Sequence, residues 1–157
     1  MRLPLVKAET QTDFVAVLER KMIRIRALLN ELNRMLDAEY EAGMAYDSKS
    51  LKKLILRKQN SVNRFEHLVR AMDEQLSLMA GREMPSARPG TLVNWMTMIP
   101  GLTRRQKDVL FPLARDLEQR HLDLMKTARR NGVLFKNALD RMSVASKYIN
   151  QGKVIVP

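Results

Sequence analysis

Glu118 and His121 are the residues whose types and spacing come closest to a chemical site. A Glu-x-x-His pair places both side chains on one face of a helix, and in di-iron helical bundles it supplies half of the metal ligands. The other half is missing, because the second histidine, His67, follows Arg64 and no inward-facing glutamates complete the set. We therefore predict no metal and no cofactor, and expect His121 to lie at the edge of the core with a hydrogen-bond partner.

The other acidic pairs do not indicate catalysis either. Glu39 and Glu41, like Asp73 and Glu74, are too close in sequence to converge on a substrate from one helix face, so we interpret them as solvated. The sequence contains no Gly-x-Ser-x-Gly, no phosphate-binding glycine-rich loop with Lys-Ser or Lys-Thr, and no His-Glu-x-x-His. It also has no cysteine, which excludes thiolate metal sites and cysteine nucleophiles. We predict that the chain is not an enzyme.

The composition favours helices and a cytoplasmic location. Of the 157 residues, 45% are hydrophobic but only 5% are aromatic, which leaves a sheet few side chains to pack. The lack of cysteine fits a reducing compartment. We find no apolar core of signal-peptide length at the N-terminus and no run of the ~20 apolar residues that a membrane span needs. We therefore expect a cytoplasmic protein without membrane insertion.

Apolar residues that recur every three or four positions predict three long helices, at about residues 11–43, 47–80 and 103–149. Candidate capping residues precede them: Thr12 or Asp13, Asp47 or Ser48, and a Thr103–Gln106 capping box. The short connection between the first two helices predicts an antiparallel hairpin. Residues 81–102 should form a loop and a short helix, and 150–157 a flexible tail. The expected fold is all-α: one domain, residues 1–157, forming an elongated, coiled-coil-like three-helix bundle.

Three features interrupt the helical pattern. Gly43 is expected to weaken the end of the first helix, and Pro112 to kink or restart the last one, because proline lacks a backbone donor. Asn131 and Gly132 break the apolar stripe in mid-helix, where a glycine costs about 1 kcal/mol relative to alanine. We therefore expect a local structural reason for this pair.

The sequence has 11 methionines, and flexible methionine side chains suit both irregular cores and surfaces that accept several helical partners. Six lie on the predicted inward stripes: Met22, Met35, Met72, Met79, Met125 and Met142. Four lie at turns, where one end of the bundle could be open: Met44, Met84, Met96 and Met98. Trp95 and its apolar neighbours are expected to plug one bundle end, with a docking patch as the alternative.

The net charge of +11 raises the question of nucleic-acid binding. The basic excess lies mainly in the C-terminal half, where basic and acidic residues are mixed, and no run of five or six like charges occurs. We interpret the charge as a solvated helical face with a basic bias, and do not expect nucleic acid as the main partner.

The segment 128–142 resembles the C-terminal helix of the flagellar FlgN family. It contains an Asn-Gly pair within a helix, then the apolar pair Leu134 and Phe135, then a further apolar ladder. Tyr148 and, four residues later, Gly152 match the way in which family members end this helix. The first half is similar in style, with a long helix that has an acidic and aromatic end, a short break, and a Leu-x-x-Leu-x-x-x-Lys start to the second helix.

This resemblance implies a cytoplasmic export chaperone that needs no cofactor. Its clients would be the flagellar hook–filament junction proteins, whose helical C-terminal segments it would hold and bring to the type III export gate or export ATPase. The predicted partner-binding residues are Asn131, Gly132, Leu134, Phe135, Leu139, Met142 and Tyr148. Asn131 and Gly132 would allow close helix approach. The alternatives are a general coiled-coil scaffold or adaptor and a basic helical nucleic-acid-binding protein.

Overall fold

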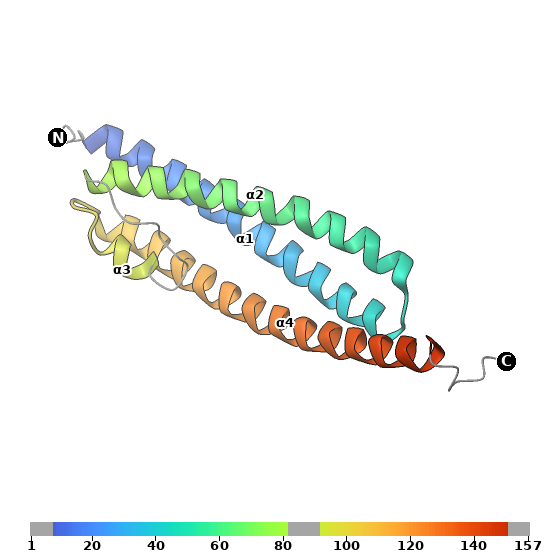
Figure 1. The fold of residues 1–157 in the computed structure, drawn as a ribbon. Coiled ribbons are helices and arrows are strands. Elements are labelled where there is room, and N and C mark those ends of the chain that lie inside the picture. The colour runs from blue at the N-terminus through green and yellow to red at the C-terminus, as the bar shows by residue number, and fades with distance from the viewer. Residues whose placement is uncertain (1–7, 82–91, 151–157) are drawn as a thin grey trace.

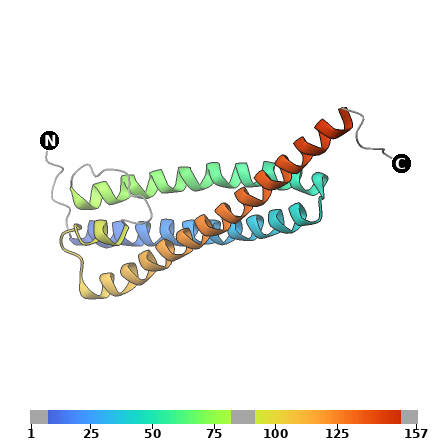
Figure 2. The ribbon, with the colours of Figure 1, turned by 60° about the horizontal axis from the view of Figure 1, so that its bottom comes forward.

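The computed structural model describes residues 8–81 and 92–150, and the side-chain surroundings of residues 12–81 and 92–137. Four helices occupy these ranges: α1 Ala8–Met44, α2 Ser48–Ala80, α3 Leu92–Met96 and α4 Arg104–Asn150. α1 and α2 form an antiparallel hairpin, and α4 crosses it diagonally from the α3 end toward the α1–α2 turn (Figures 1 and 2). The described residues contain no strand, so the predicted all-α bundle is confirmed. Met84, most of the predicted loop and the tail lie outside them.

Two of the three predicted helix starts are confirmed. Asp47 caps α2, since its Oδ1 accepts a hydrogen bond from the Ser50 backbone N–H at 3.1 Å. At the start of α4, the Thr103 N–H donates to Gln106 Oε1 (2.9 Å) and the Gln106 N–H donates to Thr103 Oγ1 (3.2 Å). α1 instead begins at Ala8, before the predicted caps at residues 12 and 13. Residues 8–11 are Ala-Glu-Thr-Gln, and three of these four favour a helix.

α4 continues through Pro112 as one helix, so the predicted restart at this residue is wrong. The proline removes one backbone donor from a helix of 47 residues, and its ring is exposed to solvent. Leu110 and Leu113 on either side are buried, and they hold the helix against the core. Packing of the apolar stripe therefore outweighs one lost hydrogen bond.

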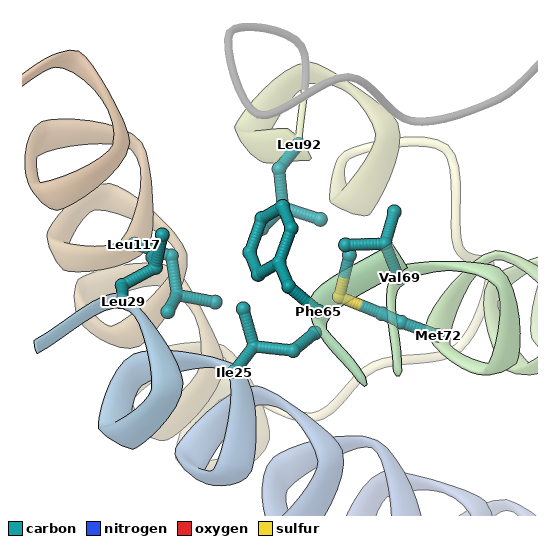
Figure 3. A pocket seen from close by; sticks show the side chains of 7 residues that line it. All are labelled: Ile25, Leu29, Phe65, Val69, Met72, Leu92 and Leu117. Atoms are coloured by element: carbon teal, nitrogen blue, oxygen red, sulfur yellow. The ribbon is translucent and has the colours of Figure 1, made fainter. Parts of the chain in front are cut away.

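The main hydrophobic core lies in the half of the bundle that contains α3, where side chains from all four helices are buried together. They meet around an apolar cavity of about 20 Å³ (Figure 3), which is lined by Ile25, Leu29, Phe65, Val69, Met72, Leu92 and Leu117. In Figure 3, Leu92 of α3 lies above Phe65 of α2 and Leu117 of α4. α3 therefore covers the gap between α2 and α4 at this end. The predicted plug is confirmed: Trp95 and Met96 are buried and do not form an exposed docking patch.

The methionines divide into core and exposed groups, although not as predicted at every position. Met22, Met35, Met72 and Met79 are buried as expected. Met125 is 43% exposed, so its predicted inward position is wrong. Met44 is exposed beside the α1–α2 turn, whereas Met96 and Met98 lie at the α3 end, so these residues do not gather at one end of the bundle. The side chain of Met142 lies outside the described part of the chain.

Candidate functional site

Glu118 and His121 connect α4 to its neighbours. Glu118 Oε1 accepts a hydrogen bond of 2.9 Å from the backbone N–H of Val93 in α3. His121 stacks on Phe65 of α2, with the ring centroids 6.4 Å apart and the ring planes at 11°. His121 is half-buried at the core edge, as predicted, but the contact that the structure shows is an aromatic stack. In residues 12–81 and 92–137, no group of three or more His, Cys, Asp or Glu side chains could hold a metal ion.

The burial of His121 makes stability depend on pH. Desolvation lowers the pKa of His121 below its ordinary value of 6.5, because a half-buried imidazolium loses hydration. The unfolded chain therefore binds this proton at a higher pH than the folded chain. The neutral His121 ring contributes stability that is fully present above pH 6.5. This stability is lost as the pH falls from 6.5 through the lowered pKa of the folded state.

We expect the His121→Gln variant to show a shallower pH dependence of the free energy of unfolding just below pH 6.5, measured by urea denaturation at several pH values. His67→Gln is the matched control, because it removes the other histidine of the chain at an exposed position on α2. Equal slopes in the wild-type protein and in His121→Gln would contradict the assignment of the effect to this ring.

A buried polar layer joins the three long helices near the α1–α2 turn. Glu39 of α1 is 1% exposed, so the prediction that it is solvated is wrong. Lys58 Nζ of α2 lies 2.8 Å from Glu39 Oε2, close enough for an ion pair, although this oxygen lacks a hydrogen bond of good geometry. Asn131 Nδ2 of α4 donates to the Leu36 carbonyl oxygen at 2.7 Å and, at 3.4 Å, to Glu39 Oε1. Asn131 is therefore the anchor of α4 on α1.

Further polar contacts tie the same flank of α4 to α1. The Arg130 guanidinium lies 3.9 Å from the centroid of the Tyr40 ring, and its Nη2 lies 3.2 Å from Asp37 Oδ1. Three turns earlier, Arg120 donates a hydrogen bond to the Asn30 side chain. These side chains therefore tie α4 to α1 at two separate levels of the bundle.

The predicted partner-binding residues have mixed surroundings. Asn131 is 2% exposed and already bonded within the chain. Leu134 and Phe135 are half-buried against Gly43 of α1, where an added Cβ would lie 3.0 Å from Phe135 Cε1 and 3.1 Å from Leu134 Cδ2. Gly43, expected only to weaken the helix end, is thus the glycine that permits close helix contact within the chain. An added Cβ on Gly132 would meet nothing within 4 Å.

Three of these residues have side chains that lie outside the described part of the chain: Leu139, Met142 and Tyr148. Their backbone continues α4 as far as Asn150. The predicted partner surface on this final portion of α4 stays a prediction.

Beyond α3, α2 and α4 carry exposed apolar side chains on the flanks that meet at the stack of Phe65 on His121. On α2, Ile55 and Val62 lie three or four residues from Lys58, and Val62 lies three from Phe65, so all four share one flank of the helix. Lys58 and Phe65 mark that flank as the one that faces the polar layer and His121 of α4. Ile55 is nevertheless 50% exposed, and Val62 is only half-buried.

α4 carries a corresponding row of exposed residues. Met125, Ala128 and Gly132 follow His121 at intervals of four, three and four residues, which keeps them on one flank. All three are exposed, so the predicted inward position of Ala128 is wrong, as it is for Met125. The reason is that α4 runs diagonally across the hairpin (Figure 2), packs mainly on α1 and makes few close contacts with α2. We call these exposed or half-buried residues of the two helices the α2–α4 seam: Ile55, Val62, Met125, Ala128 and Gly132.

The chain was compared with known proteins. No family model, curated protein or solved structure matches it. Among the described residues, no helix combines the length and the apolar character that crossing a bilayer requires. The function is therefore inferred from the α2–α4 seam and from the charges around it.

Basic side chains surround the open part of the α2–α4 seam. Residues 48–65 of α2 include six basic residues and no acidic one: Lys49, Lys52, Lys53, Arg57, Lys58 and Arg64. Lys52 precedes Ile55 by three residues and is therefore its neighbour on the helix surface. On α4, Arg129 follows Met125 by four residues and Lys136 follows Gly132 by four. The seam is thus an apolar strip between basic margins.

Proposed function

We propose that this protein is a cytoplasmic chaperone that holds an amphipathic helix of another protein in the α2–α4 seam. Its clients would be the helical C-terminal segments of flagellar hook–filament junction proteins, which it would bring to the type III export gate or export ATPase. The observation that carries the proposal is the exposure of apolar residues on both helices of the seam, where Ile55 of α2 is 50% exposed and Met125 of α4 is 43% exposed.

The dimensions of the α2–α4 seam suit a helical guest. Ile55 to Val62 and Met125 to Gly132 each span seven residues, or about 10 Å of helix. A guest helix with apolar residues at i, i+3, i+4 and i+7 presents a stripe of this length. Met125 can adapt its flexible side chain to guests of different shape.

The position of α3 supports a helical guest. At the other end of the bundle, Leu92 of this short helix is buried beside Phe65 of α2 and Leu117 of α4 (Figure 3). An apolar helix from a partner would extend this arrangement along the uncovered length. The flagellar identity of the partner is supported by the resemblance of residues 128–148 to the FlgN family.

The test is a pull-down of the C-terminal segment of a hook–filament junction protein, followed by titration calorimetry. We expect the Ile55→Asp and Met125→Asp double variant to weaken binding about 30-fold or more, because each change places a carboxylate against the apolar stripe of the guest. Leu78→Asp is the matched control: Leu78 is also an exposed apolar residue of α2, 44% exposed, but lies outside the seam.

A third variant, Leu139→Asp, separates the α2–α4 seam from the final portion of α4. If Leu139→Asp alone abolishes capture and the seam variant binds normally, the client site is the predicted C-terminal surface and the seam proposal is wrong. If the unmodified protein captures no such segment, the chaperone proposal itself fails. Helical circular dichroism of each variant shows whether a loss of binding reflects a loss of folding.

A further inference from the structure

We infer that the segment held in the α2–α4 seam is an acidic amphipathic helix, with glutamate or aspartate on both sides of its apolar stripe. This inference rests on the proposed function and specifies the chemistry of the partner at the same site. It is carried by the distribution of charge along the two walls and by the ion pairing of the residues that form them.

The α2 wall is basic along its open length. From Ser48 to Phe65 there are six basic residues and no acidic one. Lys58 is paired with Glu39 inside the bundle, so its charge is neutralised within the protein. Lys52 is exposed beside Ile55 on the outer margin of the seam, where its charge is available to a partner.

The α4 wall repeats this arrangement. Arg129 and Lys136 are exposed on the turns that follow Met125 and Gly132. Their neighbour Arg130 is instead directed to α1, where it contacts Asp37 and Tyr40. α4 thus uses one arginine for its own packing and leaves the adjacent one at the seam.

Among the residues whose side chains are described, the acidic ones beside the seam lie toward its α3 end. Glu118 is engaged by the Val93 backbone N–H. Glu66 is exposed four residues after Val62, beside the level where α3 begins to cover the groove. The part of the seam from Val62 toward Ile55 therefore presents apolar and basic side chains to a guest helix. A guest with lysine margins would meet like charges on both sides, whereas a guest with glutamate margins would meet opposite ones.

The experiment uses two labelled peptides of about five helical turns that differ only in charge. Both carry leucine at i, i+3, i+4 and i+7; one has glutamate at the flanking positions and the other lysine. Fluorescence anisotropy with the full chain should show about tenfold tighter binding of the glutamate peptide, as a few exposed ion pairs would give. This preference should shrink as the salt concentration rises from about 50 mM to about 300 mM.

Charge reversal at the margins provides the matched test. Lys52→Glu combined with Arg129→Glu should remove the preference for the glutamate peptide or reverse it. Arg24→Glu combined with Lys107→Glu is the control, because it changes the net charge equally at exposed positions outside the seam and should keep most of the preference. An equal effect of both double variants would show that only net charge matters, and would overturn the inference.

Two other results would also overturn it. If both peptides bind equally well, the seam accepts helices without regard to charge; the proposed function then stands and the inference fails. If neither peptide binds, the seam is not a helix site, and both fail. Duplex DNA and phosphatidylglycerol vesicles are added as competitors: displacement of the glutamate peptide by either at equal charge concentration would show that the basic margins serve phosphates, and would contradict an acidic helix as partner.

Discussion

The Lys58→Met variant is expected to lose about 2–4 kcal/mol of unfolding free energy, somewhat less than is typical for a fully buried pair because Lys58 is partly exposed. The substitution keeps the length of the side chain but removes the charge that lies 2.8 Å from Glu39 Oε2. Glu39 is 1% exposed, so its carboxylate would remain inside the bundle without its cationic partner. Chemical denaturation followed by helical circular dichroism measures the loss.

Two companion variants test this explanation. Lys53→Met changes an exposed lysine on the same helix and should alter stability by less than about 0.5 kcal/mol. Adding Glu39→Gln to Lys58→Met should restore much of the loss, because glutamine has no charge and its side-chain oxygen can still accept from Asn131. If the double variant is as unstable as Lys58→Met alone, the unpaired carboxylate is not the cause.

The Leu76→Ala variant is expected to lose about 3–5 kcal/mol of unfolding free energy, the upper range for a leucine truncated in a close-packed core. Leu76 is 0% exposed and lies in the core formed by all four helices. Alanine would remove its packing contacts and leave a void in this core. The chain has one tryptophan, Trp95, which is buried in the same core and reports unfolding by its fluorescence.

Leu56→Ala is the matched control for this variant. Leu56 lies on the same helix but is 69% exposed, so its truncation should change stability by less than about 0.5 kcal/mol. Similar losses in Leu76→Ala and Leu56→Ala would mean that α2 faces the core with a different side from the one described.

The helices could be predicted from the sequence because burial repeats with the helical period. On α1, Leu18, Met22, Ile25 and Leu29 follow one another by four, three and four residues, and all are buried. The capping box at Thr103 could be predicted because each of its two hydrogen bonds joins a backbone N–H to a side chain three residues away.

The helical period does not predict whether an apolar stripe is covered by both neighbouring helices. Periodicity shows which flank of α4 turns inward, but the angle at which α4 crosses the hairpin decides which residues α2 covers. Met125 and Ala128 have the spacing of core residues and are exposed because α4 packs mainly on α1. The seam therefore depends on a tertiary angle that no local pattern contains.

The sequence position of Glu39 indicates burial. It follows Leu32 by seven residues and Leu36 by three, so it lies on the inward stripe of α1 even though it is acidic. A charge at such a position needs a partner, and Lys58 and Asn131 provide one from each neighbouring helix. The Asn131–Gly132 break was recognised as unusual, but only the structure shows that Asn131 carries the contact, and Gly43 the close approach.

The polar layer also determines how far α4 can slide along the hairpin. Leucine and methionine stripes tolerate a shift by one helical turn, about 5.4 Å, because one apolar contact replaces another. The same shift would carry the amide of Asn131 away from the Leu36 carbonyl and leave Glu39 with half of its partners. Asn131 and Glu39 thus add to Arg120 and Arg130 in fixing the register of α4 on α1, and they keep the two sides of the seam at a constant offset.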